Sequence, residues 1–226
     1  MSKSDGFRAI TFFCGFMGVI LESKIKVAMA YTDFTLNDLE QKFGITNRRK
    51  RLFEQFVSIE PSKGLSEILK ELDDLPIKSE KAKSEWIVAP ILRELRNNND
   101  KFFTIHSGDN LSADEGAGLK GECDFILSKD IGTFDINYPI IQVVEAKKND
   151  IDLGVAQCAA QLLGAKIYNE KKGVQHKQIY GCVTTGNDWL FMVLQDKLYI
   201  DTKRYYLTEI NQILGVFQTI IDYYKP

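Results

Sequence analysis

An apolar run that ends in two opposite charges, PIIQVVEAKKND over residues 139–150, most strongly limits how this chain can fold. Such a run predicts a strand made for a protein core, and side chains alternate between the two faces of a strand. Glu145 and Lys147 then point to one face, which we expect Ile141 and Val143 to share. The charges should lie at the rim of a buried layer. Either the strand runs out into solvent there, or its end belongs to a metal-dependent active site.

The size and charge of the chain limit the class of protein. Its 226 residues, 44% of them hydrophobic, are enough for a sizeable core. The formal net charge of -2 argues against a surface that is basic throughout, but leaves room for a local basic groove. The four cysteines form no CxxC pair and the two histidines lie far apart. Zinc is therefore not expected, and we interpret the cysteines as free thiols of a cytoplasmic protein.

The N-terminal segment imitates a targeting signal without following its layout. Lys3 and Arg8 precede the apolar run AITFFCGFMGVIL, as in a signal peptide. Charges at positions 22, 24 and 26 interrupt the usual order before AMA, and the apolar run is too short to cross a bilayer. We expect a packed N-terminal element and no membrane association.

Residues 1–78 are expected to form a small, mostly helical region packed on the main domain, with the polar stretch DDLPIKSEKAKS as the boundary. FTLNDLEQKFGI has apolar residues at helical spacing and Thr35 as a candidate cap. NRRKRLFEQF, basic from Arg48 to Arg51, is expected to form a second helix. Residues 35–57 are therefore interpreted as two small amphipathic helices with a solvated charged corner, or alternatively as a helix-turn-helix that contacts DNA.

The pattern becomes regular in residues 79–226, which we expect to form one α/β domain. SEKAKSEWIVAPILRELRNN predicts a long helix, and KFFTIH, ECDFILS and PIIQVVEAK predict three strands. The Gly-rich stretch after KFFTIH lacks the Gly-Lys-Ser/Thr ending of a phosphate loop, so we expect a plain polar loop. A helix rich in small residues, further strands and an amphipathic C-terminal helix follow. This order predicts a mixed sheet with helices on its faces.

Three charged residues are expected to meet at one end of this sheet. Asp124, in GECDFIL, lies on the strand before the one that carries Glu145 and Lys147. Mg²⁺ takes oxygen ligands, commonly one or two carboxylates with a carbonyl and waters. Asp124, Glu145 and the main-chain carbonyl of Ala146 are therefore the candidate metal ligands. Lys147 could orient or deprotonate a water and stabilise negative charge on a phosphate.

Glu85 is a further candidate, from the helix before the strands. It has helical spacing to Val88 and Leu92 in the expected helix 79–97, so we predict that it faces inward. A buried carboxylate needs a cation or hydrogen-bond donors, and a metal or Lys147 would serve. The alternative is a carboxylate near a helix N-terminus, favoured there by the helix dipole.

Two glutamines lie four residues apart on the helix that follows the Glu-Ala-Lys strand. Gln157 and Gln161 should therefore share one face of this helix, at the same end of the sheet as the charges. They would either hydrogen-bond a DNA backbone or remain ordinary polar groups of the surface.

The order of these elements resembles the PD-(D/E)XK nuclease superfamily, which includes restriction-enzyme-like and junction-resolvase branches. A helix with Glu, a strand, strands with Asp and with Glu-x-Lys, and a helix with Gln follow one another over roughly residues 79–195. The resemblance implies an αβββαβ restriction-endonuclease-like core and Mg²⁺- or Mn²⁺-dependent hydrolysis of DNA. The site residues that it implies are Asp124, Glu145, Lys147, Glu85 and Gln157, with Glu85 completing the metal ligands.

The chain departs from that family pattern at two points. Cys123-Asp124 replaces the usual Pro-Asp, and Gln157 is followed by Gln161 where some branches carry Gln-x-x-x-Tyr. A second resemblance spans nearly the whole chain. KAKSEWIVAPILRELR, GLKGECDFILS, PIIQVVEAKKNDIDLGVAQCAAQLLGAKIYNE and IYGCVTTGNDWLFMVL are similar to a group of uncharacterised, nuclease-like proteins frequent in cyanobacteria.

The sequence leaves two main functions open. One is a metal-dependent deoxyribonuclease, and the other is a non-catalytic module of nuclease fold that binds nucleic acid or a protein partner. A regulator that uses residues 35–57 as a helix-turn-helix is a third. We also expect a homodimer, because nucleases that cut both strands often work in pairs. The apolar stripe of the C-terminal helix would pair across a two-fold axis, unless it is buried within the monomer.

Overall fold

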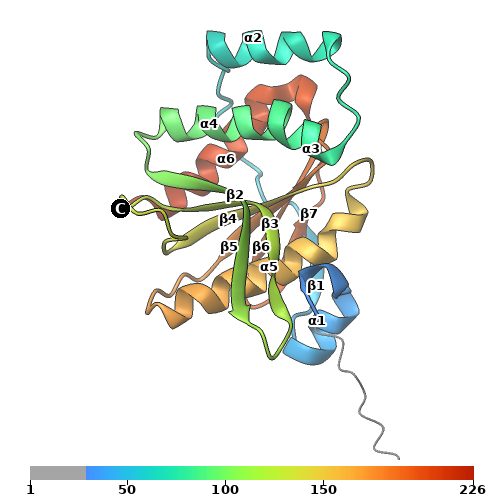
Figure 1. Ribbon diagram of the computed structural model, residues 1–226, viewed down its shortest axis with the longest axis vertical. Helices are drawn as coiled ribbons and strands as arrows, with labels where there is room; N and C mark the ends of the chain where they lie inside the picture. Colours follow the sequence, from blue (N-terminus) through green and yellow to red (C-terminus); the bar gives the residue numbers. More distant parts are fainter. Residues whose placement is uncertain (1–28) are drawn as a thin grey trace, which may run out of the picture.

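An eight-stranded mixed sheet forms the centre of the protein, with helices on both faces (Figure 1). The structure is a computed structural model that describes residues 29–226, so the signal-like N-terminal segment lies outside the described residues. The expected α/β class with a central mixed sheet is confirmed. The elements are α1 (Leu36–Phe43), β1 (Asn47–Lys50), α2 (Lys63–Glu71), α3 (Glu80–Lys83), α4 (Ala89–Asn98), β2 (Phe103–Asp114), β3 (Leu119–Lys129), β4 (Ile140–Ala146), α5 (Asp152–Lys171), β5 (Ile179–Thr184), β6 (Asp188–Leu194), β7 (Leu198–Asp201), β8 (Tyr205–Tyr206) and α6 (Ile210–Tyr224).

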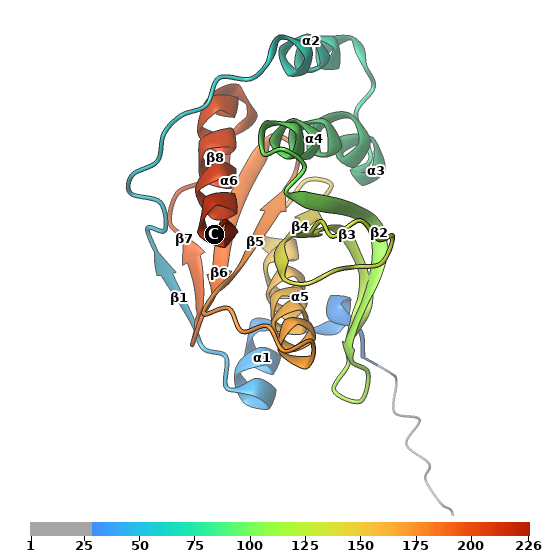
Figure 2. The ribbon, with the colours of Figure 1, turned by 90° about the vertical axis from the view of Figure 1, so that its left-hand side faces the viewer.

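Strand direction decides which residues meet at each end of the sheet. The strand order is β1-β7-β6-β5-β4-β3-β2, and β8 pairs with β6. The pairs β1–β7 and β4–β5 are parallel, while the other pairs are antiparallel. Strands β1, β4, β5 and β7 therefore finish at the same end, which is the upper end of the sheet in Figure 2. The carboxyl end of β4 carries Glu145 to this upper end.

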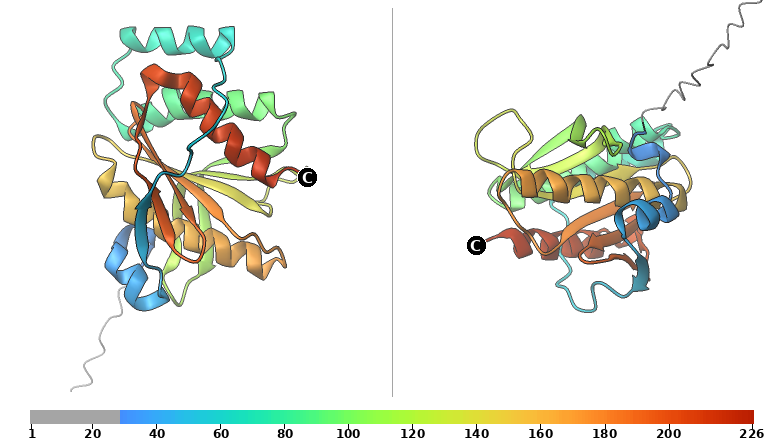
Figure 3. Two further views of the ribbon diagram at one scale, coloured as in Figure 1. Left: turned by 180° about the vertical axis from the view of Figure 1, so that it is seen from behind. Right: turned by 90° about the horizontal axis from the view of Figure 1, so that it is seen from below.

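Two apolar layers enclose the sheet. Helix α5, with α1, covers one face, and α4 and α6 cover the other (Figure 3). The fully buried side chains of the α6 layer include Trp189, Phe191 and Phe217. Burying each large apolar side chain contributes about 1.5–3 kcal/mol, so these two layers supply most of the stabilisation of the fold.

Gly164 lets α5 pack closely against Tyr31. A Cβ at this position would lie 2.1 Å from the Tyr31 hydroxyl oxygen. That hydroxyl is buried and donates to the carbonyl of Leu119 at 3.1 Å. We expect Gly164→Ala to lower the free energy of unfolding by about 1–3 kcal/mol, because Tyr31 must shift and lose this bond. Urea denaturation measures the change.

Gly64 provides the matched control, since it also lies in a helix. A Cβ there would make only an ordinary contact, 3.8 Å from the Ser62 hydroxyl. Gly64→Ala should therefore leave stability unchanged or raise it by up to about 1 kcal/mol. A Gly164→Ala variant as stable as Gly64→Ala would contradict the close packing.

The basic stretch of the N-terminal region is a strand and not a helix. Thr35 does cap α1, since its hydroxyl accepts from the Asp38 amide at 3.1 Å. Asn47–Lys50, however, form β1 at the edge of the sheet, and residues 51–57 have no regular structure. The two-helix interpretation of residues 35–57, and the helix-turn-helix alternative, are therefore wrong. The partner that makes β1 a strand lies far along the chain, where local helix signals cannot indicate it.

The Gly-rich stretch expected to be a loop is mostly paired strand. Strand β2 continues to Asp114 and β3 begins at Leu119, so a long hairpin replaces the loop. Its polar residues lie on the edge strand β2, much of which is exposed. The sequence predicted a loop because this stretch is polar. An edge strand that faces solvent can also be polar, so composition alone does not separate the two.

The apolar stripe of the C-terminal helix is buried within the chain. Its residues pack against the sheet in the α6 layer, and Ile213, Leu214 and Phe217 are fully buried. This stripe therefore offers no surface for a second copy. Within residues 29–226, no helix is long and apolar enough to cross a membrane.

Candidate active site at the upper end of the sheet

The structure brings together the three charged residues that the sequence places near one another. Asp124 lies on β3, beside the end of β4, and its carboxylate accepts from the Ala146 amide at 2.6 Å. The Lys147 ammonium donates to the Glu145 carboxylate at 2.7 Å. Because the main chain of Ala146 is bonded to Asp124, the two carboxylates and Lys147 form one cluster.

Glu145 points toward α5. Val143 and Ile141 were expected on the same face of β4, but only Val143 lies there. Val143 packs in the apolar layer between the sheet and α5, but Ile141 packs in the layer between the sheet and α4 and α6. The pairing between β3 and β4 shifts register after Leu127, because Ser128 pairs with Ile140. This β-bulge turns Ile141 to the other face, so the simple alternation expected from the sequence was wrong there.

Two glutamines of α5 complete the polar cluster. The Lys147 ammonium donates to the Gln157 side-chain oxygen at 3.0 Å, and the Gln161 amide donates to Glu145 at 2.7 Å. Gln161 is fully buried and its side-chain oxygen has no partner among the described residues. Both glutamines therefore belong to the cluster and are not ordinary surface polar groups.

Gly154, near the start of α5, leaves room for the Lys147 side chain. A Cβ there would lie 2.5 Å from a methyl group of Val183 and 3.0 Å from Cγ of Lys147. The small residue lets the helix approach β4 closely enough for Gln157 to reach the ammonium. The position of Lys147 is thus fixed by packing as well as by hydrogen bonds.

Glu85 does not face this cluster, so the prediction that it completes the site was wrong. Its side chain is 58% exposed and forms a 3.8 Å ion pair with Lys81. The helix contains a π-helical turn, Ser84–Val88, between α3 and α4. This wider turn breaks the regular spacing that related Glu85 to Val88, which is fully buried.

Glu80 lies nearer to the cluster, and the sequence argument missed it. Its carboxylate accepts from the Lys148 amide at 2.9 Å. Its charge influences the pKa of both Asp124 and Lys147. The available signal was its place in the first turn of a helix capped by Ser79, whose hydroxyl accepts from the Ala82 amide at 3.0 Å.

Burial and charge shift the pKa of each member of the cluster. Burial raises the pKa of Glu145 to about 7, the charge of Asp124 adds to this, and Lys147 opposes it. Burial also raises the pKa of Asp124, against the Ala146 hydrogen bond and the charge of Lys147. Burial alone would lower the pKa of Lys147, but the charge and hydrogen bond of Glu145 outweigh it and raise that pKa. The Glu145 carboxyl therefore keeps a proton up to about pH 7, which a bound cation would displace.

The oxygen atoms available at this site suit Mg²⁺ or Mn²⁺ better than a metal that takes all its ligands from protein side chains. Within the described residues, no group of three or more His, Cys, Asp or Glu side chains is arranged to hold a metal. Mg²⁺ and Mn²⁺ prefer oxygen ligands, and Mg²⁺ commonly keeps several waters beside one or two carboxylates. Asp124 and Glu145, with the Ala146 carbonyl at the end of β4, meet that need. Each oxygen of Glu145 accepts one hydrogen bond, which leaves a second lone pair on each oxygen for a cation.

The raised pKa of Glu145 predicts how the metal-free protein responds to pH. Between about pH 4.5 and 7 the folded chain keeps a proton that the unfolded chain has lost, so stability falls as pH rises through this window. Glu145→Gln removes this loss. In EDTA, we expect its stability relative to wild type to rise by about 1–3 kcal/mol between pH 5 and pH 8.

Thermal or urea denaturation across this pH range measures the effect. Glu85→Gln is the matched control, because the exposed Glu85 should show no such change. Parallel pH profiles for wild type and Glu145→Gln would show that the Glu145 carboxyl is not shifted in the folded protein.

Comparison with known proteins adds one distant relative. No family model matches the chain, and no solved structure matches it. Crinkler effector protein 1 of Rhizophagus irregularis is 26% identical over 187 residues, which cover 72% of this chain and 37% of that protein. The chain thus spans little more than a third of the length of this curated relative. A similarity of this extent leaves the function to be inferred from the site.

Proposed function

We propose that the protein is a Mg²⁺- or Mn²⁺-dependent nuclease of the PD-(D/E)XK type that hydrolyses DNA. The observation that most supports this is the pair of desolvated carboxylates, Asp124 and Glu145, beside Lys147 at the upper end of the sheet. Isolated buried carboxylates are costly, and a cation would offset that cost. A phosphodiester brings negative charge to the same place, which the cation and Lys147 would balance.

Each residue has a distinct role in this proposal. Asp124, Glu145 and the Ala146 carbonyl would hold the cation, which would supply a water of lowered pKa and polarise the phosphate. The raised pKa of Lys147 keeps its side chain protonated. Lys147 would therefore stabilise the negative charge that builds on the phosphate, and would not remove a proton from water. Gln157 would orient the Lys147 ammonium, to which it is bonded.

A non-catalytic module is the second candidate, and one observation favours it. Both oxygens of Glu145 accept hydrogen bonds, one from Lys147 and one from Gln161, so this carboxylate has partners without a metal. In such a module the cluster would stabilise the sheet end, and the surface around it would bind nucleic acid or a protein partner. A cytoplasmic location fits either function, because Cys123, Cys158 and Cys182 are free.

A cleavage screen separates these two functions. Labelled linear, nicked, branched and single-stranded DNA would be incubated with the protein in EDTA, Mg²⁺ or Mn²⁺, and calorimetry would measure Mn²⁺ binding. We expect cleavage only with a metal, and weaker Mn²⁺ binding in Glu145→Gln than in the Glu85→Gln control. Cleavage of no substrate, together with no Mn²⁺ binding, would favour the module.

Sedimentation at several concentrations tests the expected homodimer, and a constant monomer mass would contradict it.

A further inference from the structure

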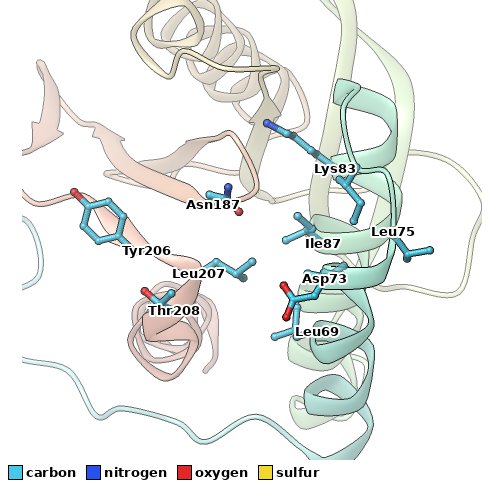
Figure 4. Close-up of a pocket in the computed structure, with 11 residues that line it drawn as sticks. Leu69, Asp73, Leu75, Lys83, Ile87, Asn187, Tyr206, Leu207 and Thr208 are labelled. Carbon is cyan, nitrogen blue, oxygen red and sulfur yellow. The ribbon is translucent and has the colours of Figure 1, made fainter.

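A cavity of about 690 Å³ opens on the side of the sheet that α4 and α6 cover (Figure 4). One wall comes from α2, the segment after it and the π-helical turn. The opposite wall comes from the turn between β5 and β6 and from the short 3-10 helix Leu207–Glu209. A cavity of this volume can hold a small organic group, since ligand pockets commonly measure about 300–1,000 Å³.

Lys83 connects one wall of this cavity to the loop that follows β4. It lines the cavity, but its ammonium points away from the cavity centre and donates to the main-chain carbonyl of Lys148 (Figure 4). The amide of the same residue donates to Glu80, and the next residue toward β4 is Lys147. The loop that carries Lys147 therefore contacts one wall of the cavity through Lys83.

The lining of the cavity suits a flat group with a polar edge. Leu69, Leu72 and Ile87 supply apolar surface. The Asp73 carboxylate and the Asn187 side chain point into the cavity from opposite sides (Figure 4). Both residues are exposed, so their polar groups are accessible to a ligand.

These features favour a nucleobase over a phosphate. A carboxylate repels phosphate, whereas it accepts a hydrogen bond from an amino group of a base. An amide side chain donates and accepts, as recognition of base edges requires. The apolar residues would contact the faces of the base ring.

We propose that this cavity binds an unpaired nucleobase of the nucleic acid whose phosphate lies at Lys147. The proposal rests on the proposed nuclease function and narrows its substrate. A base stacked inside a duplex cannot enter such a cavity, so it must be flipped out or already unpaired. The protein would then act on single-stranded, flapped or mismatched nucleic acid in preference to a continuous duplex.

The first test blocks the cavity with a bulky side chain. Thr208 lines the cavity, is exposed and lies in the middle of the short helix Leu207–Glu209, so Thr208→Trp fills the cavity without entering the core. Thr32→Trp is the matched control, because Thr32 is exposed at the middle of another three-residue 3-10 helix, Tyr31–Asp33, outside the cavity.

We expect Thr208→Trp to weaken binding of labelled single-stranded ten-nucleotide DNA about tenfold in EDTA, and Thr32→Trp to leave it unchanged. Fluorescence anisotropy measures binding, and circular dichroism confirms that both variants fold. Equal binding by wild type and both variants would overturn the proposal.

A second variant tests recognition of the base itself. Asp73→Asn turns a pure acceptor into a group that also donates, so it should change the ranking of dA, dC, dG and dT ten-nucleotide strands. An unchanged ranking together with unchanged affinity for an abasic strand would overturn base recognition.

The outcomes also separate this proposal from the nuclease function. If the wild type cleaves DNA with metal but Thr208→Trp keeps its preference for unpaired strands, the cavity proposal fails and the nuclease stands. If the wild type binds the single strand through the cavity but never cleaves, the nuclease fails and the cavity proposal stands. Absence of both binding and cleavage would remove both.

Discussion

Replacing Lys147 with alanine is expected to slow metal-dependent DNA cleavage by about 100-fold or more, the usual effect of losing a charge-stabilising group. The ammonium lies 2.7 Å from Glu145 and 3.0 Å from Gln157, so it is held where the phosphate charge would build. Single-turnover cleavage at saturating Mn²⁺ isolates this loss from weakened metal binding. Glu145→Ala should differ, since it removes a candidate ligand and should weaken the binding of Mn²⁺ itself.

The experiment needs control of folding, because Lys147 is also the ionic partner of the buried Glu145. Removing one member of a buried pair leaves an uncompensated charge, so Lys147→Ala should also melt at a lower temperature. Rates are therefore compared at a temperature at which circular dichroism shows every variant folded. Lys129→Ala, an exposed lysine at the far end of β3, should cleave like wild type. A Lys147→Ala variant with the wild-type rate would remove the proposed role of this site.

The largest effect on stability is expected from Trp189. Its ring is fully buried against Phe217, with ring centres 5.8 Å apart, and its indole N–H donates to the Gly186 carbonyl at 2.9 Å. Trp189→Ala should lower the free energy of unfolding by about 3–5 kcal/mol, because it opens a cavity and leaves that carbonyl unpaired. Urea denaturation followed by circular dichroism measures the loss.

Trp86 provides a direct comparison with Trp189, since it is the other tryptophan of the chain and is 45% exposed. Trp86→Ala should change the free energy of unfolding by less than about 1 kcal/mol. Similar losses in the two variants would mean that Trp189 does not anchor α6 on the sheet. The comparison also separates an effect of core packing from the general loss of an aromatic side chain.

The regular elements of the second half of the chain could be predicted because their signals are local. The buried strand β4, the small-residue helix α5 and the amphipathic helix α6 each show their pattern within one segment. The proximity of Asp124 to Glu145 could also be predicted from the sequence, because successive strands of a sheet commonly pair. Pairing of β3 with β4 is enough to join the two carboxylates.

The remaining features depend on geometry that no single segment shows. Glu85 was misplaced because a π-helical turn looks like ordinary helix in the sequence. Ile141 was misplaced by a β-bulge, which a strict alternation of faces cannot represent. Gln161 was considered a DNA contact or a surface group, yet the close packing of α5 turns it onto Glu145. In each case tertiary packing overrides the local pattern.

The parallel pairing of β1 with β7 affects how the chain folds during synthesis. At about 5–20 residues per second, β7 leaves the ribosome roughly 8–30 s after β1, so the nascent edge strand must wait for its partner. Unpaired strands invite association with neighbouring chains, and positive side chains discourage it. The basic residues Arg48, Arg49 and Lys50 are exposed on β1. Like charges on β1 of neighbouring nascent chains repel each other, which opposes pairing between these strands before β7 is made.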